Sequence, residues 1–321
     1  MITDIFKRIL FWLDCSRAFA LPMTVMSWLV VFVWGIKHSG CVFNGILALF
    51  GIIFAHLATN LIDDYCDYKI LCSNEKYIQS AQKCKCAHIF EGRVTLRQML
   101  VMIIVYCILA ASIGLVLTFK AGLPVIWLAL IGAVVTLFYQ KCSLVGLSEA
   151  AVFIAYGPLM FEGVYFVMTK SFSFDVLLLS FAVVMFTLGF LYVHTMLDFD
   201  GDMTSHKKTL CCRIGDKNIA IKLLAVFYTF GYIAAAILAF YSKNPFLLIT
   251  FLTVPLAIIT YNETKIFKKS RIPVVRWWNM PFENQKFYLQ EGSFGFYFTL
   301  FQARNLMTEF CILISLAILL P

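Results

Sequence analysis

Charged side chains are scarce in this sequence, and their scarcity indicates the solvent in which the chain folds. Lys, Arg, Asp and Glu make up 14% of the 321 residues, whereas hydrophobic residues make up 61% and the mean hydropathy is +0.86. Soluble domains carry roughly 25% charged residues. The low value excludes an ordinary water-soluble protein, because one core could not bury so many apolar side chains. We therefore predict an integral membrane protein.

Apolar runs long enough to cross a bilayer recur along the whole sequence. A helix needs about 20 apolar residues to cross the hydrocarbon core. The first run is too long for a cleavable signal peptide and precedes no small-residue cleavage site, so we expect it to be retained. We predict an all-α fold, forming a single domain over residues 1–321. Nine spans are predicted, at residues 19–36, 42–62, 99–119, 123–139, 150–168, 176–196, 221–241, 246–261 and 296–320.

Lys and Arg are distributed unevenly between the predicted connections. Nearly all lie in alternate connections, and the turns between them hold only Lys37, Lys120, Lys170 and Lys243. Cationic connections tend to stay on the cytoplasmic side. We therefore predict a cytoplasmic N-terminus and an active end that opens toward the cytoplasm. The same asymmetry accounts for the formal net charge of +8, so we expect anionic membrane lipid as a partner and no nucleic acid.

Two groups of acidic residues stand at the predicted cytoplasmic ends of the second and sixth spans. Residues 59–68 read TNLIDDYCDY, and residues 194–210 read HTMLDFDGDMTSHKKTL. Residues three and four apart share a helix face, so each group forms one stripe. Like charges repel there, at a cost that rises near hydrocarbon, so a counter-ion is expected. The stripes consist of Asn60, Asp63, Asp64 and Asp67, and of His194, Asp198 and Asp202.

Mg²⁺ is the counter-ion that suits these side chains, with Mn²⁺ as a substitute. It prefers oxygen ligands, is usually held by one or two carboxylates, and completes its shell with water and substrate phosphates. Lys207, Lys208 and Arg213 follow the second stripe and add positive charge. The pattern predicts a diphosphate site at the membrane edge. Two alternatives stay open, namely solvated helix ends and a cation-binding or lipid-binding transporter.

The two motifs resemble those of the UbiA superfamily of intramembrane prenyltransferases. Members have nine transmembrane helices and join a polyprenyl diphosphate to an acceptor with Mg²⁺. The resemblance implies that Lys207 contacts the diphosphate and acts in catalysis together with the aspartates. It also implies four metal ligands, which are Asp64, Asp67, Asp198 and Asp202.

A third stretch, GLSEAAVFIAYGPLMFEGVYFV at residues 146–167, is similar to the menaquinone branch, the 1,4-dihydroxy-2-naphthoate polyprenyltransferases. The resemblance implies an aromatic acceptor that is a quinone precursor, and a location in a bacterial inner membrane. Other acceptors stay open, including 4-hydroxybenzoate, another phenol and a lipid glycerol phosphate. The matching residues are Gly146, Leu147, Glu149, Gly157, Pro158, Gly163 and Tyr165.

The sequence also departs from the family pattern. Asp63 stands where the family has asparagine, and the acidic residue expected at 70–74 is missing. We expect Asp63 to replace that acid. An arginine that often precedes the second motif is absent, and His194 lies nearby. His194 could orient Asp198, contact diphosphate or act as a base, or it could be structural.

Further substrate contacts are expected from cations and aromatic rings. Besides Asn60, Asp63 and His194, we assign Lys208 and Arg213 to substrate binding. Tyr139 and Tyr156 are the aromatic candidates for stabilising an allylic cation. The basic, Trp-containing segment 265–296 is predicted to lie at the membrane interface, with a lid over the site as the alternative.

Overall fold

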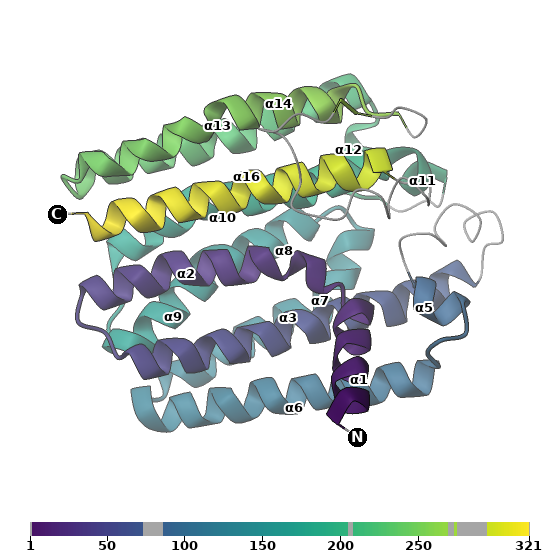
Figure 1. Ribbon diagram of the computed structural model, residues 1–321, viewed down its shortest axis with the longest axis horizontal. Helices are drawn as coiled ribbons and strands as arrows, with labels where there is room; N and C mark the ends of the chain where they lie inside the picture. The colour runs from purple at the N-terminus through teal and green to yellow at the C-terminus, as the bar shows by residue number, and fades with distance from the viewer. Residues whose placement is uncertain (1, 73–85, 205–207, 269–272, 275–293, 321) are drawn as a thin grey trace.

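The chain folds as a bundle of long helices that lie side by side (Figure 1). The computed structural model describes residues 2–72, 86–204, 208–268, 273–274 and 294–320. In these ranges nine helical segments are long and apolar enough to cross a membrane, which confirms the predicted all-α fold and the nine spans. They are η1–α2 (Ala18–Ala20, Leu21–Lys37), α3 (Val42–Leu71), α6 (Leu96–Ala121), α7 (Pro124–Leu144), α8–η2–α9 (Ser148–Ile154, Ala155–Leu159, Met160–Thr169), α10 (Phe174–Leu197), α13 (Lys217–Tyr241), η3–α14 (Pro245–Thr253, Val254–Lys265) and α16 (Phe294–Leu319).

Local sequence signals account for several helix starts. Thr95 and Gln98 form a reciprocal capping box at the start of α6, which satisfies backbone N–H groups that have no partner inside the helix. The Asp216 side chain accepts from two backbone N–H groups at the start of α13. Pro124 opens α7, where its missing N–H removes no helical hydrogen bond.

Burial divides the spans into central and peripheral ones. α10 and α16 are the most buried, whereas α6 and α7 are the most exposed. The main core includes Phe186, Phe301 and Phe310, and the rings of Phe186 and Phe310 stack with centroids 3.9 Å apart. Peripheral spans rich in exposed apolar side chains suit a lipid environment, since lipid solvates them without penalty.

The second span is longer than its hydropathy predicts. We predicted that this span ends at residue 62, but α3 continues to Leu71 and contains all three aspartates of the first motif. This expectation was wrong because aspartates were taken as loop residues. They are buried here, and Arg17 neutralises part of their charge.

The fifth span contains an irregular turn. Between α8 and α9 the chain forms one π-helical turn, η2, in which Gly157 has the non-helical angles φ −93° and ψ −112°. Pro158 follows and has no N–H to donate. In such turns the α-helical hydrogen-bond pattern is locally interrupted, and they are frequent at functional sites.

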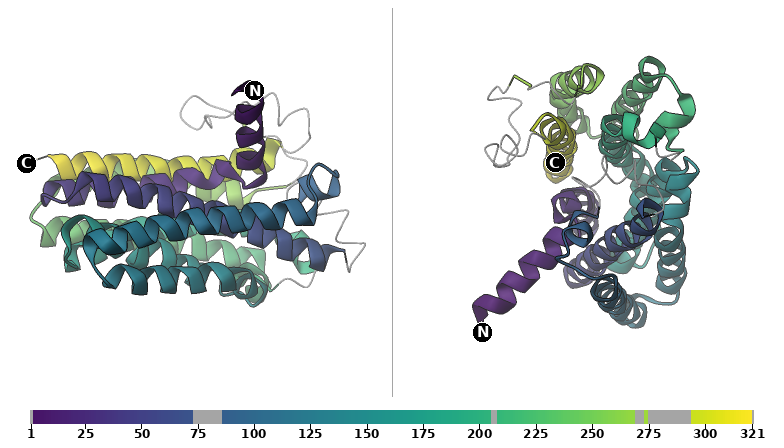
Figure 2. Two further views of the ribbon diagram at one scale, coloured as in Figure 1. Left: turned by 90° about the horizontal axis from the view of Figure 1, so that it is seen from below. Right: turned by 90° about the vertical axis from the view of Figure 1, so that its right-hand side faces the viewer.

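An additional helix, α1 (Ile2–Cys15), precedes the spans and was not predicted. It extends away from the bundle and runs across the direction of the spans (Figure 2). It exposes apolar side chains, among them Ile5, Phe6, Ile9 and Leu10. Short helices α5 (Ala87–Phe90), α11 (Phe199–Thr204) and α12 (Leu210–Ile214) lie in the connections at the end of the bundle where α3 and α10 end (Figure 1).

Candidate functional site

The first acidic motif forms a buried group on the last turns of α3. Asp63, Asp64 and Asp67 are 8%, 5% and 4% exposed, so none is an ordinary solvated helix end. A buried carboxylate is costly unless it is paired or hydrogen-bonded. The surroundings of these three side chains therefore have to supply positive charge and donors.

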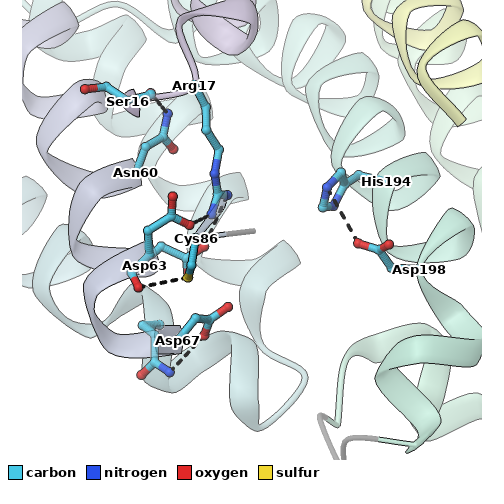
Figure 3. Close-up of polar contacts among 10 residues, drawn as sticks. Ser16, Arg17, Asn60, Asp63, Asp67, Cys86, His194 and Asp198 are labelled. Carbon is cyan, nitrogen blue, oxygen red and sulfur yellow. Dashed lines mark hydrogen bonds and ion pairs between the residues drawn. The ribbon is translucent and has the colours of Figure 1, made fainter. Parts of the chain in front are cut away.

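Arg17 supplies the positive charge. It precedes η1 in a left-handed conformation with φ 54°, and its guanidinium pairs with Asp64 and lies 3.4 Å from Asp63 Oδ2 (Figure 3). Burial by itself lowers the pKa of Arg17, but the charge of Asp63 raises it, and the net shift is upward. Arg17 therefore stays cationic beside the carboxylates.

Neutral donors hold the rest of this group. The Asn60 amide donates to the backbone carbonyl of Ser16 at 2.8 Å, and Gln140 of α7 donates to Asp67 Oδ1 at 3.4 Å. The Cys86 thiol contacts the backbone carbonyl of Asp64 at 3.2 Å (Figure 3). Three elements besides α3 thus fix the motif. Asp63 Oδ1 is buried and finds no hydrogen-bond partner among the described residues.

The second acidic motif begins at the end of α10. His194 Nε2 lies 3.7 Å from Asp198 Oδ2, and Figure 3 shows this pair on the side opposite the α3 group. Asp202 on α11 is buried, and its backbone N–H donates to the carbonyl of Asp198 at 2.9 Å. Asp200, between them, is exposed and pairs with Lys217 at 2.8 Å. The buried and exposed aspartates of this segment thus have different environments.

The predicted cations differ in where they lie. Lys208 and Arg213 are exposed, and both pack against the turn between α7 and α8. A Cβ added to Gly146 there would lie 2.6 Å from the Lys208 backbone oxygen and 2.8 Å from Arg213 Cδ. Lys207 lies outside the described residues, as does most of the segment 265–296.

The two predicted tyrosines have different surroundings. Tyr139 on α7 packs against Val152, Val184 and Leu188 and lies within electrostatic reach of Arg17. Tyr156 on η2 makes hydrogen bonds with two side chains of α2 and α3. Both rings lie in the bundle and not on its lipid face.

Sequence reasoning missed Arg17, Gln140 and Cys86. Arg17 was counted only as a cation that sets topology. A signal was present, because this arginine stands alone in the segment CSRAF just before an apolar span. No local pattern marks Gln140 or Cys86, since each reaches the motif from a distant part of the chain.

The donor set is suitable for a hard divalent cation, although it does not enclose one. Among the described residues no three His, Cys, Asp or Glu side chains come together as a metal site. Mg²⁺ needs only one or two protein carboxylates when a substrate phosphate completes its shell. Asp63 Oδ1, buried and unpaired within the described chain, is the kind of oxygen that such a cation would satisfy.

The chemistry open to this end of the bundle follows from its charges. Buried carboxylates of α3 and α11, the half-buried Arg17 and nearby exposed cations can together hold a metal-bound polyanion at the border of a water-poor interior. An apolar chain attached to that anion would extend between the spans.

Comparisons with known proteins agree with this architecture. The family model described as the UbiA prenyltransferase family matches residues 19–279. No curated protein matches the sequence.

Solved structures match over nearly the whole chain. A UbiA homologue from Aeropyrum pernix K1 is similar with a TM-score of 0.63 and 16% identity, over 92% of this chain and 96% of that one. A UbiA homologue from Archaeoglobus fulgidus, bound to GPP and Mg²⁺, has a TM-score of 0.59 and 14% identity, over 92% and 99%. A digeranylgeranylglyceryl phosphate synthase is similar with a TM-score of 0.57 and 13% identity, over 97% of both chains. At these identities the likeness concerns the fold.

Proposed function

The chain belongs to the UbiA prenyltransferase family, and from this premise we propose that it transfers a polyprenyl group from a prenyl diphosphate to an aromatic acceptor. The acceptor we propose is a quinone precursor such as 1,4-dihydroxy-2-naphthoate. One observation carries the proposal. Three buried aspartates on the last turns of α3 meet the half-buried Arg17, at the end of the bundle where the second acidic motif also lies (Figure 3).

The charges of the site suit a departing diphosphate. When the prenyl C–O bond breaks, negative charge builds on the diphosphate oxygens, and fixed positive charge lowers the barrier. We propose that Arg17 and Lys207 serve this purpose, with Lys208 and Arg213 guiding the diphosphate to the site. Bound Mg²⁺ would add charge stabilisation, held by Asp64, Asp67, Asp198 and Asp202.

Exclusion of water is the second requirement. An allylic cation reacts with water, so its site has to be dry. The spans around the site are apolar, and Tyr139 and Tyr156 present rings inside the bundle, where an aromatic face can stabilise a cation. We propose that the prenyl chain lies between the spans beside these rings.

The acceptor and the location follow from the sequence resemblance. The matched segment 146–167 includes Glu149, which is buried and accepts from the Ser148 hydroxyl at 2.9 Å. We propose that the active end opens toward the cytoplasm, in a bacterial plasma membrane. Related structures support prenyl diphosphates as substrates, since Archaeoglobus fulgidus homologues are bound to GPP or DMAPP with Mg²⁺.

The test is a direct assay on purified full-length protein in bilayers. The protein is incubated with Mg²⁺, prenyl diphosphates of graded length and a panel comprising 1,4-dihydroxy-2-naphthoate, 4-hydroxybenzoate and glycerol phosphates. We expect a prenylated naphthoate by mass spectrometry, loss of product with excess chelator, and recovery with Mg²⁺ or Mn²⁺. Full activity in excess chelator would contradict the role of the metal, and product with only another acceptor would correct the substrate.

A further inference from the structure

A second polar cluster lies deeper in the bundle, on the same helix as the first acidic motif. His56 of α3 is 8% exposed, and its Nδ1 lies 2.5 Å from the hydroxyl of Tyr156 and 2.7 Å from that of Thr24. The two hydroxyls are themselves 3.1 Å apart. The three polar atoms form a triangle that joins α2, α3 and the π-helical turn η2.

The triangle determines which nitrogen of His56 carries the proton. If Nδ1 is protonated it can only donate, and its N–H can be shared between the two hydroxyl oxygens while one hydroxyl donates to the other, so each of the three contacts has a hydrogen. If Nε2 carries the proton instead, two hydrogens serve three contacts and one pair of acceptors repels. The network therefore assigns the proton to Nδ1 and leaves Nε2 with an accepting lone pair.

That lone pair is buried and unsatisfied. Nε2 of His56 is inaccessible to solvent and has no hydrogen-bond partner among the described residues. A buried acceptor without a donor costs free energy, and an ionisable side chain inside a membrane span is a functional candidate. His56 Nε2 can therefore accept a hydrogen bond from a donor that the described residues do not provide.

The position of His56 relates it to the acidic motif. It precedes Asn60 by four residues and Asp64 by eight on one continuous helix, so it lies about 6 Å and about 12 Å deeper along the axis. His56 also lies within electrostatic reach of Arg17, which pairs with Asp64. A molecule at His56 is therefore close to a prenyl group whose diphosphate is held by the motif.

We propose that His56 Nε2 binds the acceptor by accepting a hydrogen bond from its hydroxyl group, with Tyr156 and Thr24 holding the imidazole in the accepting tautomer. This inference rests on the proposed prenyl transfer and adds the residue that would contact the hydroxyl group of the acceptor. His56 then touches substrate, whereas Tyr156 and Thr24 are positioning residues for the imidazole.

The experiment compares acceptors that do and do not donate. Wild-type protein in bilayers is assayed with Mg²⁺, a prenyl diphosphate and the best acceptor from the panel, and the methyl ethers of that acceptor are titrated as competing ligands. Wild type should bind the hydroxyl compound at least about tenfold more tightly than the ether that blocks the bound hydroxyl. His56→Leu should lose this preference, raising the KM of the hydroxyl acceptor by a similar factor. The KM of the prenyl diphosphate should stay within about twofold.

Two further variants separate binding from folding. His56→Gln keeps an accepting group near the position of Nε2 and should restore most of the preference. Tyr156→Phe should raise the acceptor KM, whereas Tyr232→Phe should change only thermal stability. Tyr232 is the matched control because its hydroxyl also bonds a buried threonine, Thr253, at 2.7 Å, away from the motif.

The outcomes distinguish this inference from the function on which it rests. If wild type forms no prenylated product, the proposed function is wrong and the inference is lost with it. If wild type is active but does not prefer the hydroxyl compound over any of its methyl ethers, only the inference is overturned. The same holds if well-folded Tyr156→Phe keeps the wild-type acceptor KM, whether or not His56→Leu folds.

Discussion

The guanidinium of Arg17 pairs with the carboxylate of Asp64, which lies 47 positions later in the chain. The same guanidinium lies 3.4 Å from Asp63, so one cation serves two adjacent carboxylates. This arrangement balances charge that would otherwise be buried and repulsive. It also means that Arg17 competes with any metal ion for the oxygens of Asp63 and Asp64.

Replacing Arg17 should have opposite effects on metal and diphosphate. In Arg17→Gln the carboxylates lose a competing cation. In the absence of diphosphate, the Mg²⁺ concentration that half-saturates the site should therefore fall severalfold. The KM of the prenyl diphosphate should rise about tenfold or more, because a charge-assisted contact is lost. Calorimetric Mg²⁺ titration and steady-state kinetics measure the two quantities. Arg93→Gln is the control, since Arg93 is exposed and pairs with exposed Glu91 at 2.9 Å. A shift of both quantities in the same direction would contradict the competition.

Asp63→Asn should weaken metal dependence without affecting the acceptor. One negative charge is removed while an amide that can hydrogen-bond remains, so half-maximal activity should move to higher Mg²⁺ concentration. The KM of the acceptor should be nearly unchanged, because the proposed acceptor site at His56 lies deeper in the bundle. Mg²⁺ is titrated against both proteins at saturating diphosphate. An unchanged curve would mean that Asp63 serves only as a partner of Arg17.

The four aspartates proposed to hold the metal should matter far more for turnover than their exposed neighbour Asp200. Asp64→Ala, Asp67→Ala, Asp198→Ala and Asp202→Ala should each lower turnover at least about a hundredfold, the scale expected for losing a group that stabilises transition-state charge. Asp200→Ala is the matched control, because Asp200 lies in the same segment but is exposed and paired with Lys217. The turnover of Asp200→Ala should stay within about twofold of wild type. A well-folded variant of any of these four aspartates with wild-type turnover would remove that residue from the site.

Gly146→Ala should disturb the docking of the segment that carries Lys208 and Arg213. Its φ of +70° alone costs an alanine about 1 kcal/mol, and the added Cβ would also lie 2.6 Å from the Lys208 backbone oxygen. Gly92→Ala separates the two effects, because Gly92 has the same φ and nothing within 4 Å of the added Cβ. We expect a lower melting temperature and a higher diphosphate KM for Gly146→Ala, and only a small stability loss for Gly92→Ala. Equal behaviour of the two variants would show that the contact with Lys208 is unimportant.

Hydropathy alone predicted the number and order of the spans. Each span is an almost continuous apolar run, which is either buried in the bundle or exposed to lipid. The end of α3 was not predicted, since aspartates favour loops in water, and here Asp63, Asp64 and Asp67 continue the helix against Arg17. Pairings of this kind join residues far apart in sequence and leave no local pattern.

The deeper polar cluster was hidden for a similar reason. His56 is a single histidine in an apolar run, and such a residue has no periodic signal to distinguish it from packing. Its significance depends on Thr24 and Tyr156, from two other elements, meeting at one nitrogen. Tyr156 was selected as an aromatic ring that could face a cation, whereas the structure shows that its hydroxyl is engaged as well.

Helix α1 lies next in the chain to Arg17, the residue that pairs with the first acidic motif. Its exposed face of Ile5, Phe6, Ile9 and Leu10 is of the kind that lies in the lipid interface, and the helix ends two residues before Arg17. A bilayer that is thinner or thicker than the bundle would displace α1 relative to α3. Diphosphate affinity should therefore vary with lipid acyl length in wild type and vary less in Arg17→Gln. Reconstitution into phosphatidylcholines of graded length measures this mechanical coupling.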